Sequence, residues 1–207
     1  MSTRTPRRTR TALAVAAIAG SAALATFPLT TASASEGGVA VQYRTSASGA
    51  TADQSEPWLK VRNTGATSVA LNQVKIRYYF KADSPTATYR FACSWAVKGC
   101  SAITGTFGTL ANPTATADRY LEIGFTSAAG SLAPGADTGD MQLRFHQANW
   151  QTLTQGDDYS FQGAPTSYTD WTKVTAQLAG VNVWGTAPAG NEPTEPPTTP
   201  PTTPPTT

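Results

Sequence analysis

Apolar and polar residues alternate with a period of two along several short runs, and this pattern most constrains the fold. Between Gln73 and Lys81, every second residue is apolar: Val74, Ile76, Tyr78 and Phe80. Successive side chains of a strand point to opposite faces, so the run is expected to be a half-buried strand. Runs 120–126 and 141–146 alternate in the same way, and no run shows a helical period.

Shorter runs with strand composition complete the pattern. They cover residues 39–43, 58–62, 88–95, 171–177 and 181–184, and clusters of Gly, Pro, Asn, Asp and Ser separate them. Eight or nine strands at this spacing predict an all-β fold, an antiparallel β-sandwich. Because many unrelated functions use sandwiches, the fold alone does not assign one.

Both ends of the 207-residue chain differ from this central part. Residues 1–34 combine a basic start, an Ala-rich apolar stretch and the triplet Ala32-Ser33-Ala34, which predicts a secretory signal peptide and an extracellular protein. The pair Arg7-Arg8 leaves twin-arginine export open beside the general pathway. Residues 35–188 form the expected module.

Residues 189–207 repeat Pro-Pro-Thr-Thr and contain nothing apolar after Ala189. Proline fixes φ and removes amide donors, so this segment is predicted to be an extended linker. Such a linker normally joins two modules. We therefore expect a catalytic or scaffold module that was once attached or still is in a longer chain.

The net charge changes sign when the predicted signal peptide is left out. The whole chain has 15 Lys and Arg against 13 Asp and Glu, a net charge of +2. Four of the basic residues and no acidic ones lie in residues 1–34, so the expected mature chain has a net charge of −2. This removes the only compositional indication of nucleic acid as a partner.

The sequence offers little for catalysis. His146 is the only histidine, no Gly-x-Ser-x-Gly occurs, and no pair of carboxylates stands out for glycoside hydrolysis. A binding module without enzymatic activity is the expectation that remains, acting as a monomer with neither nucleic acid nor, after leader cleavage, a membrane as partner.

Six motifs occur in an order that closely resembles the family 3 carbohydrate-binding modules of bacterial cellulases and cellulosomal scaffoldins. The resemblance covers residues 39–188. The motifs are Val41-Gln42-Tyr43-Arg44, Val61-Arg62-Asn63-Thr64-Gly65, Val74-Lys75-Ile76-Arg77-Tyr78-Tyr79-Phe80, Tyr120-Leu121-Glu122-Ile123-Gly124-Phe125, Gly156-Asp157-Asp158-Tyr159-Ser160-Phe161 and Val183-Trp184-Gly185. The resemblance implies a nine-stranded jelly-roll sandwich that binds cellulose and usually holds a structural calcium ion.

Family members bind cellulose through a linear strip of aromatic and polar residues. By resemblance, Arg144 and Trp150 match the strip arginine and tryptophan, and Gln142 matches a further polar contact. Ser94 and Trp95 stand where the better-known members have an Asp-His pair, and no residue matches an additional strip tyrosine. We expect Trp95 and Trp150 to be surface residues, whereas Trp58, Trp171 and Trp184 lie in strand patterns that predict burial.

The family calcium site takes oxygen ligands from a strand end and from an acidic turn. By resemblance the ligands are Lys81, Asp83, Thr154, Asp157 and Asp158, with a solvated acidic turn as the alternative. Adjacent carboxylates repel unless a cation or donors lie between them, which favours a hard cation here. Lys81 replaces a family threonine.

Cys93 and Cys100 are the only cysteines and have six residues between them in an expected secreted chain, so a disulfide is predicted. Trp95 lies inside the loop that this bond would close.

The favoured function is non-catalytic binding of cellulose, in particular crystalline cellulose, that brings an attached module to insoluble polysaccharide. Two alternatives remain open. One is the accessory branch of the same family, which packs beside a glycoside hydrolase, extends its cleft and binds cellulose weakly. The other is a secreted protein that binds chitin or another flat glycan.

Overall fold

The structure is a computed structural model that describes residues 38–191. The predicted signal peptide and residues 192–207 of the predicted linker lie outside the described residues. Fourteen strands lie in the described part, of which five have only two residues each.

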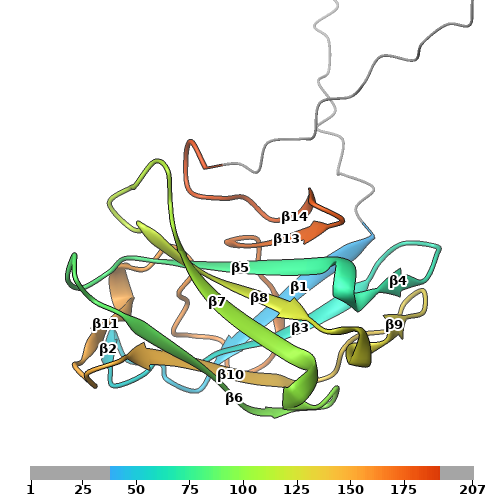
Figure 1. The fold of residues 1–207 in the computed structure, drawn as a ribbon, viewed down its shortest axis with the longest axis horizontal. Coiled ribbons are helices and arrows are strands. Elements are labelled where there is room, and N and C mark those ends of the chain that lie inside the picture. The colour runs from blue at the N-terminus through green and yellow to red at the C-terminus, as the bar shows by residue number, and fades with distance from the viewer. Residues whose placement is uncertain (1–37, 192–207) are drawn as a thin grey trace, which may run out of the picture. The chain divides into compact units, whose positions relative to one another are not determined.

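Two five-stranded antiparallel sheets form the sandwich (Figure 1). The first sheet has, in spatial order, β12(Thr169–Asp170), β1(Val39–Thr45), β3(Pro57–Asn63), β10(Met141–Gln147) and β6(Tyr89–Ala96). The second sheet has β14(Val181–Trp184), β13(Val174–Leu178), β5(Val74–Phe80), β8(Arg119–Phe125) and β7(Ile103–Thr109).

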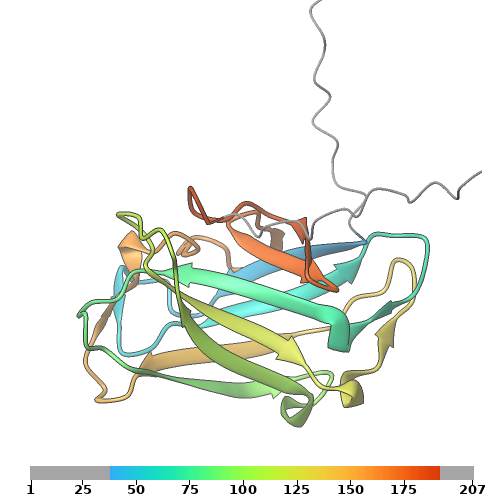
Figure 2. The same cartoon turned by 45° about the horizontal axis from the view of Figure 1, so that its top comes forward.

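Smaller elements close the ends of the sandwich. Two two-stranded sheets pair β11(Leu153–Thr154) with β2(Thr51–Ala52), and β4(Val69–Ala70) with β9(Ser131–Leu132). Four single-turn 3₁₀ helices connect strands: η1(Leu71–Gln73), η2(Cys100–Ala102), η3(Ser127–Ala129) and η4(Gln155–Asp157). Figure 2 shows the two large sheets facing each other.

The core fills the space between the sheets, as the alternation predicts. In β5 the side chains of Val74, Ile76 and Tyr78 are fully buried, and in β10 those of Met141 and Leu143 are as well. All eight runs predicted as strands contain one, although the run 171–177 begins as a strand only at Val174. The antiparallel sandwich is therefore confirmed.

Strand β7 was not predicted, because two glycines interrupt its alternation. A side chain at Gly105 would collide with the ring of Phe91, since a Cβ there would lie 2.3 Å from Phe91 Cγ. A Cβ at Gly108 would lie 2.2 Å from the Tyr120 ring. These glycines leave room for aromatic rings of neighbouring strands, and sequence alone does not reveal that close approach.

The three tryptophans predicted to be buried differ in whether they pack against the core. Trp171 and Trp184 are half-buried and pack against the core, and the indole N–H of Trp171 donates to the Ser160 carbonyl at 2.8 Å. For Trp58 the prediction of a core position is wrong. Its neighbours Pro57 and Leu59 are buried, so the alternation of β3 places Trp58 on the outer face of the first sheet.

The described residues on both sides of the predicted boundary at residue 188 contact the rest of the module. Ala187 is buried beside Tyr79 in a small second cluster outside the second sheet. The side chain of Asn191 donates to the Asn112 carbonyl at 2.6 Å, and the Asn112 side chain donates to the Gly190 carbonyl at 2.5 Å. The first residues of the predicted linker therefore pack on the module.

Candidate functional site

The outer face of the first sheet carries most of the predicted binding residues. On β10, Gln142 and Arg144 point outward and are half-buried, while Met141, Leu143 and Phe145 point into the core. His146 continues the outward positions of the same strand. Adjacent strands of a sheet lie about 4.8 Å apart and hold their side chains at fixed spacing, so this face is a rigid platform.

Trp95 lies beside Gln142 because of an irregularity in β6. The register pairs Gln142 with Trp95 and Leu143 with Cys93, so Ser94 is an extra residue in a β-bulge. A bulge breaks the alternation of faces, and Ser94 and Trp95 are consequently both exposed. The Trp95 side chain is 49% exposed, as predicted for a surface residue.

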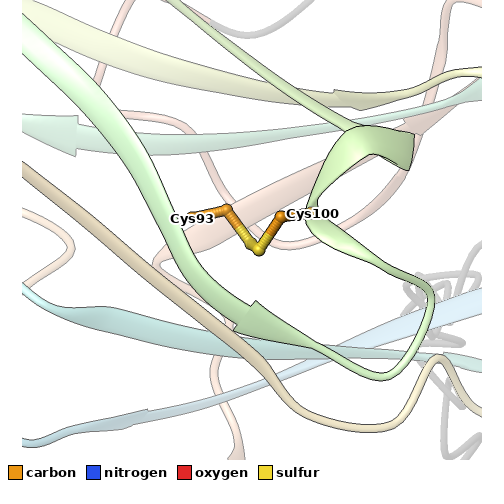
Figure 3. Close-up of a disulfide and its surroundings, with 2 residues drawn as sticks. All are labelled: Cys93 and Cys100. Carbon is orange, nitrogen blue, oxygen red and sulfur yellow. A yellow bond between two sulfur atoms is a disulfide. The ribbon is translucent and has the colours of Figure 1, made fainter.

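The predicted disulfide is present and closes the loop that follows Trp95. It joins Cys93 on β6 to Cys100 at the start of η2, with the two Cα atoms 5.5 Å apart (Figure 3). Ser94 and Trp95 lie between the two cysteines. The bond thus ties the end of β6 to the segment that leads into β7.

Trp150 lies in a turn beyond the end of β10. Its backbone N–H donates to the Gln147 carbonyl at 2.9 Å, and its φ of 58° lies in the left-handed region that non-glycine residues seldom adopt. Trp150 is 57% exposed, and its indole stacks on the His146 imidazole. The ring centroids are 3.6 Å apart and the ring planes lie within 11° of parallel.

These residues form a strip along β10, which we define as Trp95, Gln142, Arg144 and Trp150. Trp95 and Gln142 lie at one end, Arg144 in the middle, and Trp150 over His146 at the other end. At about 3.4 Å per residue, the distance from Gln142 to His146 along the strand is about 14 Å. The structure therefore brings the predicted strip residues together on one face.

Arg144 is held by Gln54 and, through it, by Glu56, neither of which the sequence indicated. Its Nη1 donates to Gln54 Oε1 at 3.4 Å. The Gln54 amide in turn donates to the carboxylate of Glu56, which also accepts a hydrogen bond from Ser46. Position 94 carries a serine, so it supplies no carboxylate to the strip. The Glu56 carboxylate is instead linked to Arg144 through Gln54. The link joins distant segments, so only the tertiary structure reveals it.

The predicted calcium ligands lie around the turn at η4. Asp158 Oδ1 accepts a hydrogen bond from the Lys81 amide at 2.7 Å, and Asp83 Oδ1 accepts one from the Thr154 amide at 2.8 Å. Burial raises the pKa of the Asp158 carboxyl to about 9, the Lys81 amide opposes that rise, and the charges of nearby carboxylates, among them Asp157 and Asp83, add to it.

The Lys81 ammonium makes an ion pair with Asp118 Oδ2 at 3.3 Å, so its charge is balanced by a residue outside the predicted ligand set. Within residues 38–191, no group of three or more His, Cys, Asp or Glu side chains is arranged to hold a metal ion. The chemistry fits a hard cation, because the Asp158 carboxyl is buried and lies near other carboxylates. Backbone oxygens would have to complete its coordination.

Comparison with known proteins identifies the family to which the chain belongs. Residues 40–185 match the protein family described as "Cellulose binding domain". The chain belongs to the family 3 cellulose-binding modules. These modules are non-catalytic, and the solved family members are β-sandwich jelly rolls like the fold described above.

Solved modules and larger proteins contain similar sequences. The family 3b module of the scaffoldin subunit ScaA from Acetivibrio cellulolyticus has a TM-score of 0.70 and 38% identity, with 74% of this chain and 99% of that chain covered. β-Mannanase/endoglucanase A of Caldicellulosiruptor saccharolyticus is 42% identical over 161 residues, which are 78% of this chain and 12% of that protein.

Cellulosomal-scaffolding protein A of Acetivibrio thermocellus is 36% identical over 163 residues, with 75% of this chain and 9% of that protein covered. The chain thus spans only a small part of these two larger proteins. Among the described residues, no helix is long and apolar enough to span a membrane.

Proposed function

We propose that this family 3 module binds crystalline cellulose through the strip on the outer face of the first sheet. The observation that carries the proposal is the pair of exposed indoles, Trp95 and Trp150, on a rigid sheet with Gln142 and Arg144 between them. Sugar rings in cellulose present flat faces of C–H groups, onto which an indole stacks, while the hydroxyl groups at their edges need polar partners.

A rigid, preformed face keeps the entropic cost of binding low. Because glucan carries no charge, no counterions are released, and the affinity should change little with salt. Binding of this kind raises the local concentration of whatever is attached to the module, and no bond in the polysaccharide is altered.

The composition of the two terminal segments supports an arrangement of the chain in three parts. We infer that residues 1–34 direct secretion and that the segment from 189 to 207 connects the module to a catalytic or scaffold partner. Two larger relatives, β-mannanase/endoglucanase A and cellulosomal-scaffolding protein A, support this inference, since a similar module makes up 12% and 9% of their lengths.

Calcium belongs to the same proposal. The side chains of Asp83, Asp157 and Asp158, with oxygens of Lys81 and Thr154, would hold the ion. Its charge would stabilise the ionised Asp158 carboxylate and join the segment after β5 to the turn at η4. Support comes from the position of Asp158, whose pKa is raised to about 9 by burial and by the charges of nearby carboxylates, among them Asp157 and Asp83.

Sedimentation tests the binding proposal. The chain beginning at Ser35 is mixed with microcrystalline cellulose, chitin or a soluble glucan, and the bound fraction is measured. We expect binding to cellulose, with Trp150→Ala weaker by about tenfold or more. Val181→Ala, which removes an exposed apolar side chain from the second sheet, is the matched control and should bind like the wild type.

Each result separates one alternative. A wild-type chain that stays in the supernatant with cellulose would contradict the proposal and favour the accessory branch, which packs beside a hydrolase. Preference for chitin would favour another flat glycan. Equal binding by Trp150→Ala would contradict the strip assignment while leaving cellulose binding in place.

A further inference from the structure

A second set of outward side chains crosses the strands of the first sheet. The register pairs Arg44 with Trp58, Trp58 with Gln142, and Gln142 with Trp95. These four residues therefore form one row, which we call the cross-strand row, over the neighbouring strands β1, β3, β10 and β6. With three strand spacings, the row is about 14 Å long.

The end of the row at β1 is held in place by its neighbours. The Arg44 guanidinium carbon lies 4.2 Å from the centroid of the Trp58 ring and 5.2 Å from that of Tyr168. Arg44 Nη1 also donates to the Thr166 carbonyl at 3.2 Å, and Lys60 Nζ lies 4.5 Å from the Tyr168 ring centroid. Cation–π contacts of this kind order the side chains before any ligand arrives.

The position of Trp58 is not explained by the core. The core cluster lies between the two sheets, on the side of β3 that carries Leu59 and Val61. Trp58 instead exposes part of a large apolar ring on the outer face, next to a residue of the strip. Trp58 therefore adds a third indole to the face that carries Trp95 and Trp150, next to Gln142 of the strip.

The cross-strand row and the strip share Gln142 and Trp95 at one end of the strip, and from there they run in different directions. The strip follows β10 toward Trp150, whereas the row crosses the strands toward Arg44. A single extended glucan chain lies along only one of these directions. A flat array of chains packed side by side extends in both and contacts both sets of residues.

We propose that Trp58 and Arg44 are further binding residues, and that the row they form with Gln142 and Trp95 selects ordered arrays of glucan chains over isolated chains. This inference rests on the proposed function, because it assumes that the strip binds cellulose. Trp58 provides a further aromatic contact beside the strip, and Arg44, whose guanidinium lies over the Trp58 ring, orients that ring and donates hydrogen bonds to hydroxyl groups.

The test compares affinities on two forms of the same polymer. Adsorption isotherms of the chain beginning at Ser35 are measured on microcrystalline cellulose and on amorphous regenerated cellulose. The variants are Trp58→Ala, Arg44→Ala and, as the strip reference, Trp150→Ala. Arg77→Ala is the matched control, because Arg77 makes the corresponding cation–π contact with Tyr120 (4.4 Å) on the second sheet. Thermal unfolding of each variant shows that it is folded.

On microcrystalline cellulose, Trp58→Ala and Arg44→Ala should bind about two- to tenfold more weakly, as expected for the loss of one aromatic or cation–π contact. On amorphous cellulose both should bind like the wild type, whereas Trp150→Ala should be weaker on both forms. Arg77→Ala should be unchanged on both.

Two results would overturn the inference and leave the proposed function standing. One is wild-type affinity of folded Trp58→Ala and Arg44→Ala on microcrystalline cellulose while Trp150→Ala is weakened. The other is an equal loss on both forms, which would assign Trp58 to the same chain as the strip. A wild-type chain that fails to adsorb at all would instead contradict the proposed function itself.

Discussion

The imidazole of His146 lies directly against the indole of Trp150, with ring centroids 3.6 Å apart and planes within 11° of parallel. His146 is 9% exposed, whereas Trp150 is 57% exposed, so one ring supports the other against the sheet. The His146 Nδ1 atom lies 2.7 Å from the Gln147 carbonyl oxygen, which fixes the orientation of the supporting ring.

From this stack we predict that His146→Ala weakens binding to cellulose although His146 itself is covered. Loss of the supporting ring removes a contact of about 0.5–1.5 kcal/mol and lets the indole leave its flat orientation, so adsorption should fall about two- to tenfold. Adsorption isotherms on microcrystalline cellulose measure it. His146→Phe keeps a flat ring and should retain most of the affinity; an alanine variant with wild-type affinity would contradict the supporting role.

The backbone at Trp150 leads to a second prediction, about stability. An alanine at φ 58° carries a steric cost that a glycine avoids. We therefore expect Trp150→Gly to be more stable than Trp150→Ala by about 1 kcal/mol, with both variants defective in binding. Chemical denaturation measures the difference. An alanine variant as stable as the glycine variant would show that the turn relaxes once the indole is gone.

The disulfide should affect both stability and binding. Closing a short loop stabilises by about 2 kcal/mol on the chain-entropy model, so Cys93→Ser/Cys100→Ser should lower the free energy of unfolding by about that amount. Because Trp95 lies within the loop that the disulfide closes, the affinity of the double variant for cellulose should fall as well. Denaturation and adsorption under identical conditions measure the two effects. Unchanged affinity in a folded double variant would limit the disulfide to stability.

Calcium should raise the unfolding temperature of the wild-type chain. An ion that binds only the folded state stabilises it by mass action, and chelation should reverse the effect. Asp158→Asn should lose most of this calcium-dependent shift, because it replaces the carboxylate that lies deepest in the proposed ligand set. Asp170→Asn, at an exposed carboxylate on β12, is the control and should keep the shift. No calcium response in the wild type would favour the solvated acidic turn.

Much of the fold could be predicted because alternation is a local property. The run 73–81 places Val74, Ile76 and Tyr78 on one face whatever the rest of the chain does, and the structure buries all three. Prediction failed at β7, where Gly105 and Gly108 make room for rings from other strands. The need for that room arises only when distant strands pack together.

The features of the candidate site likewise fall into those that the sequence predicts and those that depend on tertiary structure. The sequence by itself determined the strand pattern, the outward direction of Gln142 and Arg144, the pairing of the two cysteines and the family resemblance, since all of these depend on neighbouring residues or on motif order.

Only the tertiary structure decided what surrounds them: the β-bulge that exposes both Ser94 and Trp95, the stack of Trp150 on His146, and the outward position of Trp58 beside Gln142. The physical reason is register. Which residues of two strands lie opposite each other depends on how the whole sheet assembles, and a chain read one residue at a time does not contain that information.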